Sequence, residues 1–139
     1  MAFRILLAAG HDDYRRSLRE LIEAARALLP VPLEVDEAAS VEGARERLAS
    51  AATDALLVDW SLAGADTLAA VRGLLAEHPD LRVLVLIPDV RRQYREAAWS
   101  VGACACVPRE RIDPEWLQAM LCVMSRAKER EARAHRRVE

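Results

Sequence analysis

The residue with the clearest chemical potential is Asp59, which directly follows an uninterrupted apolar run over residues 55–58. Such a run, closed by an acid and then a turn through Gly64, is typical of a fully buried parallel strand. Parallel strands bring their last residues to the carboxyl edge of a sheet, which is where open α/β sheets bind ligands. Asp59 is therefore the first candidate for a functional carboxylate, and its role depends on the partners that the rest of the chain supplies.

Three arginines form a second candidate site, for contacts with another protein. Arg91, Arg92 and Arg95 crowd the first turns of an expected helix over residues 90–101. The helix macrodipole disfavours positive charge at that end, so helix stability does not explain these residues. We hypothesise that they contact an acidic partner or a second subunit; an ordinary solvated face is the alternative.

The histidines and cysteines do not predict a metal site or a disulfide. The three histidines are scattered along the chain, and the three cysteines lack zinc-like spacing. Cys104 and Cys106 would share one face of a strand, too far apart for an unstrained disulfide. We expect them to be small buried side chains, with a redox switch as the alternative.

The elements that would position these residues alternate regularly. Apolar runs predict five strands, over residues 3–9, 33–37, 55–59, 83–87 and 104–107. Helical periodicity predicts five intervening helices, in which Asp12 or Asp13, Ser40 and Asp113 are candidate caps and Trp99 and Trp116 are candidate core residues. The second strand alternates apolar and acidic residues and is expected at an edge. The pattern predicts an α/β, flavodoxin-like (βα)5 three-layer sandwich with strand order 2-1-3-4-5.

Length and charge limit the function classes. The 139 residues, with a net charge of −2, predict one folded domain without a global attraction to nucleic acid or membrane. No apolar run approaches the roughly 18 residues of a membrane span, and Arg4 before an apolar strand does not suggest a signal peptide. We expect a cytoplasmic location. We divide the chain into a domain over 1–125 and a charged helical extension or linker over 126–139, which carries six basic and three acidic residues.

Residues 3–125 resemble the receiver domain of bacterial two-component response regulators. The resemblance rests on the strand ending in Asp59, the Leu-Ala-Gly-Ala-Asp loop over 62–66, similar to the family's Met-Pro-Gly-Met-Asp, the strand over 83–86, and Gly-Ala at 102–103. The spacing of His11, Arg15 and Leu18 resembles the subfamily with a C-terminal helix-turn-helix output domain. The resemblance implies a phosphorelay signalling module, not a classical enzyme, with Asp59 as the phosphoacceptor.

The chain departs from the family at the positions that would assist Asp59. Phosphoryl transfer in the family needs Mg²⁺, held by carboxylates at the end of the first strand, and Mg²⁺ is usually bound by one or two carboxylates and substrate oxygens. At these degenerate positions the chain has Ala9 and Gly10 in place of the metal-binding acids, so we expect Mg²⁺ binding to be weak or absent. Ile87 replaces the phosphate-sensing hydroxyl residue, Arg109 replaces the lysine, and Cys106 replaces the switching aromatic residue.

These departures favour a pseudo-receiver that acts by protein contacts or dimerisation and controls transcription. The resemblance places the partner surface on the face of the fourth helix, fifth strand and fifth helix, with an output domain beyond the C-terminus. One alternative is a working phosphoacceptor that recruits Asp12 or Asp13 as substitute metal ligands. Another is direct nucleic-acid binding through the basic tail. Asp59 could also be purely structural, paired with Arg109 or with local backbone donors.

Overall fold

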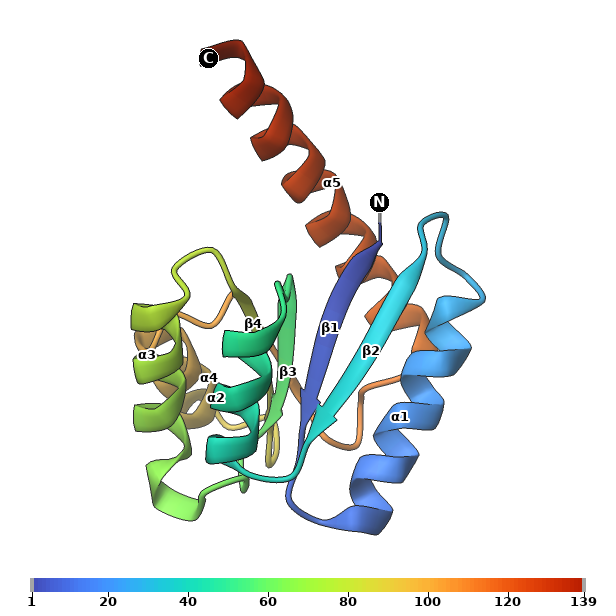
Figure 1. The fold of residues 1–139 in the computed structure, drawn as a ribbon. Helices are drawn as coiled ribbons and strands as arrows, with labels where there is room; N and C mark the ends of the chain where they lie inside the picture. Colours follow the sequence, from blue (N-terminus) through green and yellow to red (C-terminus); the bar gives the residue numbers. More distant parts are fainter. Residues whose placement is uncertain (1, 139) are drawn as a thin grey trace.

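A parallel sheet of five strands forms the centre of the protein in a computed structural model that describes residues 2–138 (Figure 1). The strands lie in the order β2-β1-β3-β4-β5, and each neighbouring pair is parallel. This confirms the predicted flavodoxin-like topology. The strands are β1 (Phe3–Ala8), β2 (Leu33–Ala38), β3 (Ala55–Asp59), β4 (Arg82–Ile87) and β5 (Ala105–Pro108).

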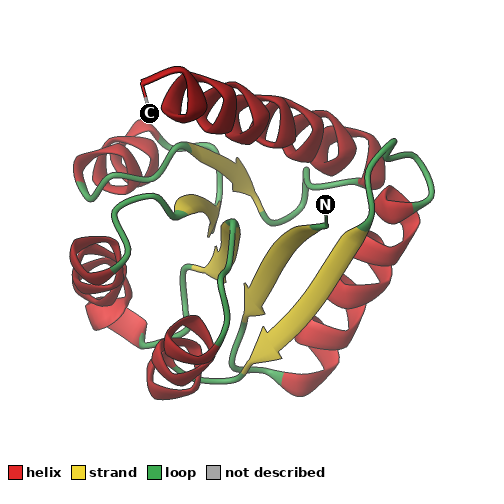
Figure 2. Cartoon of the chain, turned by 45° about the horizontal axis from the view of Figure 1, so that its top comes forward, coloured by secondary structure: helices red, strands yellow, loops and turns green. Residues whose placement is uncertain are grey.

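Helices cover both faces of the sheet (Figure 2). One apolar cluster joins α1 and α5 to one face, and a second cluster joins α2, α3 and α4 to the other. Successive strand residues point to opposite faces, so Leu7 belongs to the first cluster and Leu6 to the second. The helices are α1 (Asp12–Arg26), α2 (Val41–Ser50), α3 (Thr67–Glu77), α4 (Arg92–Ser100) and α5 (Pro114–Val138), and a short 3-10 turn (Gly64–Asp66) precedes α3.

The edge and cap predictions are largely correct. Strand β2 pairs only with β1 and is only partly buried, as its alternating acids indicated. Ser40 Oγ accepts a hydrogen bond from the Gly43 backbone N–H at 3.0 Å, and Asp113 caps α5 by accepting from the Trp116 N–H at 2.7 Å. The capping role of Asp12 or Asp13 is wrong, because both residues lie inside the first turn of α1 and His11 precedes the helix.

Helix α5 continues without a break through the charged extension and protrudes past the amino ends of the strands (Figure 1). The proposed boundary between residues 125 and 126 therefore lies within this helix. Two ion pairs fasten the extension to the sheet: Lys128 Nζ lies 3.0 Å from Asp54 Oδ2, and Arg82 Nη2 lies 2.5 Å from Glu131 Oε1. The first turns of the extension are thus docked rather than fully solvated.

Two burial predictions are wrong. Trp99 is 56% exposed, because its side of α4 points away from the sheet, while Trp116 is half-buried against the α1/α5 cluster. Cys104 is exposed and precedes β5, so only Cys106 lies on that strand.

Among the described residues, no helix combines the length and apolar character needed to cross a bilayer.

Candidate functional site

Asp59 and Arg109 form a bidentate ion pair at the carboxyl edge of the sheet. Asp59 is the last residue of β3 and is only 1% exposed, whereas the Arg109 side chain, which follows β5, is 33% exposed. Arg109 Nε donates to Asp59 Oδ1 at 2.8 Å and Nη2 donates to Oδ2 at 3.0 Å. This two-pronged geometry is specific to arginine, because its planar fork matches a carboxylate.

Ser61 completes the coordination of the Asp59 carboxylate. Its backbone N–H donates to Asp59 Oδ2 at 3.0 Å, and its hydroxyl donates to the same oxygen. An acid that accepts from the residue two positions later forms a local turn, a signal that could have identified Ser61 from the sequence. Both carboxylate oxygens are therefore engaged by donors from the protein.

Tyr14 is a further member of this site that sequence reasoning missed. It lies in the first turn of α1, and its buried hydroxyl has no hydrogen-bond partner among the described residues. Burial, and next the negative charge of Asp59, raise the pKa of Tyr14 to about 12, although Arg109 opposes the rise. The hydrogen bond from Arg109 to Asp59 in turn raises the pKa of the Arg109 guanidinium. The three side chains form one electrostatic unit.

The raised pKa of Tyr14 predicts a loss of stability at high pH. The folded-state pKa of about 12 exceeds the ordinary tyrosine pKa of 10.0, so the folded state holds the phenol proton more tightly. The contribution of protonated Tyr14 to the free energy of unfolding is complete below pH 10 and declines as the pH rises towards 12. Because the ring is only partly buried, solvent reduces the size of the effect. Tyrosine absorbance should show one group titrating near pH 12 that disappears in Tyr14→Phe; a titration unaltered by this substitution would contradict the assignment.

The region beside Asp59 does not fit a Mg²⁺ site. Ala9 is fully buried, and its carbonyl oxygen accepts a hydrogen bond from Arg15 Nη1 at 2.9 Å, which brings a cation to the end of β1. Gly10 and the buried Ile87 offer no side-chain oxygen. Across residues 2–138 no group of three or more acidic, histidine or cysteine side chains is arranged to hold a metal. Asp59 itself is already engaged by Arg109.

The proposed substitute ligands are paired elsewhere. Asp12 Oδ1 lies 2.8 Å from Arg15 Nη2, and Asp13 Oδ1 lies 3.5 Å from Arg16 Nη1. Their side chains are 80% and 82% exposed, as expected for the solvent side of a first helical turn. The structure therefore gives both acids partners on their own helix.

An aromatic stack extends from the Asp59 site to α4. Trp60, the residue after Asp59, meets Tyr94 edge-to-face with ring centroids 5.1 Å apart. The guanidinium of Arg91 lies over the same Tyr94 ring, 5.8 Å from its centroid. These contacts connect Trp60, the residue after Asp59, with Arg91 at the start of α4.

The arginine cluster is exposed at the start of α4, with Arg91 just before the helix. Arg91 Nε lies 3.2 Å from Asp89 Oδ2, and Arg92 pairs loosely with Glu96 at 4.0 Å. Arg95 has no ion pair with a described residue, and its charge reaches the thiol of Cys106 on β5. Arg95 is therefore the member of the three whose charge acts on a side chain of β5.

The cysteines on this side show no sign of activation. Partial desolvation of the two sulfur atoms raises the pKa of the Cys104 and Cys106 thiols, outweighing the nearby arginine charges. A raised pKa lowers the fraction of reactive thiolate, so the redox-switch alternative gains no support.

Comparison with known proteins identifies the fold. No protein-family model and no curated protein sequence matches the chain. A two-component response regulator from Clostridium difficile is similar in structure, with a TM-score of 0.75 and 17% identity over 89% of this chain and 96% of that one. The signal receiver domain of a DNA-binding response regulator from Colwellia psychrerythraea 34H gives 0.76 and 13%, over 89% and 98%. A CheY-like receiver domain protein from Methanospirillum hungatei JF-1 gives 0.74 and 14%, over 94% and 99%.

Proposed function

We propose that this chain is a receiver-like signalling domain that acts through protein contacts and not through metal-dependent phosphorylation. The observation that carries the proposal is the bidentate pair between Asp59 and Arg109. Support also comes from the receiver fold of the similar structures and from the departures at Ala9, Gly10 and Ile87. The domain is a regulatory module and not a classical enzyme.

The ion pair opposes phosphoryl transfer for two reasons. A carboxylate nucleophile needs an accessible oxygen in line with the phosphoryl group, but both Asp59 oxygens accept hydrogen bonds and the side chain is only 2% exposed. Phosphoryl transfer also depends on cations that neutralise the charge of the transferring group. Here the nearest cation already neutralises Asp59 itself.

Titration with Mg²⁺ and beryllofluoride, which mimics an aspartyl phosphate, tests this proposal. Trp60 adjoins Asp59, so binding in the pocket should alter tryptophan fluorescence. We expect no saturable change up to tens of millimolar Mg²⁺, with or without beryllofluoride, and an identical response from Asp59→Asn. A saturable change that Asp59→Asn abolishes would instead favour the working phosphoacceptor.

We further propose that the arginine cluster, Arg91, Arg92 and Arg95, lies at the contact surface for a second copy or an acidic partner. Its exposure, the position of Arg95 beside β5 and the exposed Trp99 on the same helix support this surface. The DNA-binding regulator from Colwellia supports a role in transcription, in which α5 would lead to an output domain.

Replacing all three arginines of the cluster with alanine should weaken association at least tenfold, about 1.4 kcal/mol. The expected cause is the loss of exposed charge that no acidic residue within 2–138 fully neutralises. Sedimentation equilibrium of the chain would measure self-association, with a matched triple variant as the control. The control changes exposed arginines on other helices, namely Arg16, Arg45 and Arg72. Equal association of both triple variants would exclude this surface as the contact with a second copy.

A further inference from the structure

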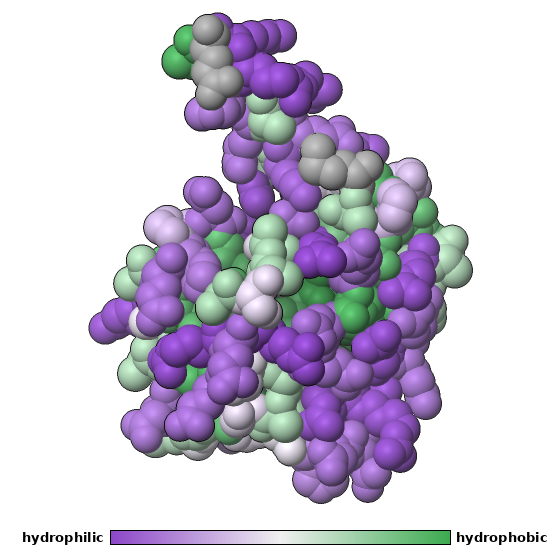
Figure 3. All heavy atoms as spheres, viewed as in Figure 1, coloured by the Kyte–Doolittle hydropathy of each residue, from purple (hydrophilic) through white to green (hydrophobic). Residues whose placement is uncertain are grey.

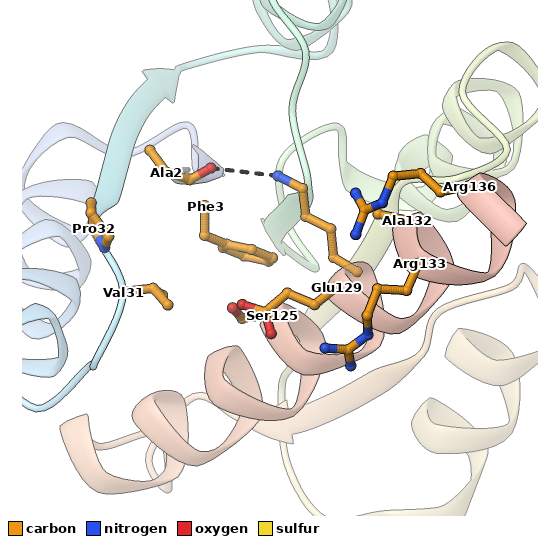
Figure 4. Close-up of a pocket in the computed structure, with 10 residues that line it drawn as sticks. Ala2, Phe3, Val31, Pro32, Ser125, Glu129, Ala132, Arg133 and Arg136 are labelled. Carbon is orange, nitrogen blue, oxygen red and sulfur yellow. Dashed lines mark hydrogen bonds between the residues drawn. The ribbon is translucent and has the colours of Figure 1, made fainter.

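A cavity of about 380 Å³ lies where α5 overhangs the amino ends of β1 and β2 (Figure 4). Phe3, Val31 and Pro32 form its apolar side, and α5 forms the opposite side with Ser125, Lys128, Glu129, Ala132, Arg133 and Arg136. Asp59 ends a strand at the carboxyl edge of the sheet, whereas Phe3 begins one at the amino edge. The cavity is therefore separate from the Asp59 site.

The basic side chains at the cavity differ in whether they have an acidic partner. Lys128 is held at one wall: it donates to the Ala2 carbonyl oxygen at 3.4 Å, pairs with Asp54, and lies 5.9 Å from the Phe3 ring centroid. Arg133 and Arg136 are exposed and have no ion-pair partner among the described residues. Glu129 is the one acid among the described residues of the lining. The mouth thus carries a surplus of positive charge beside an apolar wall.

A smaller hollow of about 230 Å³ adjoins this cavity along the same side of α5. It shares Val31, Ser125 and Glu129 with the larger cavity and adds Pro30, Cys122 and Arg126. We refer to these two adjoining cavities together as the groove, and its lining mixes apolar and basic residues. Hydrophilic side chains dominate the protruding part of α5 around it (Figure 3).

We propose that this groove binds a small amphipathic anion, with an apolar body and a carboxylate or phosphate head. The volume lies in the range of small-molecule sites, which combine mostly apolar linings with a few oriented polar groups. Arginine forks at the mouth suit a carboxylate or phosphate head, while Phe3 and Val31 suit an apolar body. Such a ligand would hold the extension of α5 against the sheet. The proposal does not depend on the function proposed for Asp59.

Calorimetric titration with decanoate tests this proposal, with decanol and decyltrimethylammonium as neutral and cationic probes. We expect saturable binding of decanoate that is at least tenfold tighter than that of either control. Ala132→Trp, which fills the groove from α5, and Arg133→Gln with Arg136→Gln should each weaken binding at least tenfold. Arg130→Gln with Arg137→Gln, on exposed positions outside the lining, should leave it unchanged. Circular dichroism establishes that each variant is folded.

Lys128 provides a second readout because it is the only lysine in the chain and lines the cavity. Bound decanoate should slow acetylation of Lys128, as measured by mass spectrometry, and should not slow it in Ala132→Trp. Absence of saturable decanoate binding, equal binding of the three probes, or full binding by Ala132→Trp would overturn the proposal. Loss of self-association in Ala132→Trp without decanoate binding by the unmodified chain would also overturn it, and would assign the groove to a second copy.

Discussion

Arg109→Ala should destabilise the fold by about 3 kcal/mol, because it leaves a buried carboxylate without its cation. Asp59 is 1% exposed and cannot move into water without disrupting the end of β3. The expected loss lies at the lower end of the range for broken buried pairs, since Arg109 is one-third exposed and Ser61 still donates to Asp59. Urea denaturation of the unmodified and variant chains measures the difference.

Substitution of the acidic partner, Asp59, should destabilise the fold less. Asp59→Asn should cost about 1–2 kcal/mol, because the freed Arg109 guanidinium can turn to solvent. Arg111→Ala is the matched control, since Arg111 is exposed, lies two residues further on and forms no ion pair with a described residue; it should change stability by less than about 0.5 kcal/mol. Similar losses for Arg109→Ala and Arg111→Ala would show that the pair does not hold the site together.

The sequence predicted the strand order and the position of Asp59 because both depend on local patterns. Uninterrupted apolar runs identify β3 and β4, and the alternating acids of β2 mark an edge. The pairing of Asp59 with Arg109 was foreseen as an alternative, and the two residues meet because Asp59 ends β3 and Arg109 follows β5 at the same edge of the sheet. Its bidentate geometry depends on how the two side chains approach each other in space, which no sequence pattern records.

The missed contacts depend on tertiary packing. Tyr14 approaches Asp59 from α1, and Arg15 turns back to the carbonyl of Ala9. The anchoring of α5 was missed for a similar reason, since the charge pattern around Lys128 indicates a solvated helix. Its partner Asp54 precedes a strand far away in the sequence. A one-dimensional pattern shows that a side chain is charged, but not which distant residue will neutralise it.

The double substitution Gly10→Asp with Arg109→Lys should increase Mg²⁺ affinity at least tenfold, about 1.4 kcal/mol. Gly10→Asp adds an acid at the end of β1, and Arg109→Lys loosens the ion pair with Asp59. A Cβ at Gly10 would lie 3.6 Å from the Ala39 carbonyl oxygen, an ordinary contact, and the backbone there is not left-handed, so aspartate fits. Lysine is a point charge and cannot hold both Asp59 oxygens as an arginine fork does. One Asp59 oxygen would then be available to a metal ion that the carboxylate introduced by Gly10→Asp also binds.

Tryptophan fluorescence during Mg²⁺ titration measures this gain, with each single substitution as a control. Gly10→Asp alone should gain little, because Arg109 still occupies Asp59, and Arg109→Lys alone should gain little, because Asp59 remains a single carboxylate. A larger response from the double variant than from the sum of the singles would show that the ion pair and the missing acid act together. If Gly10→Asp alone binds Mg²⁺ as well as the double variant, the ion pair is not the barrier. The absence of acidic side chains at Ala9 and Gly10 would then account for weak Mg²⁺ binding without Arg109.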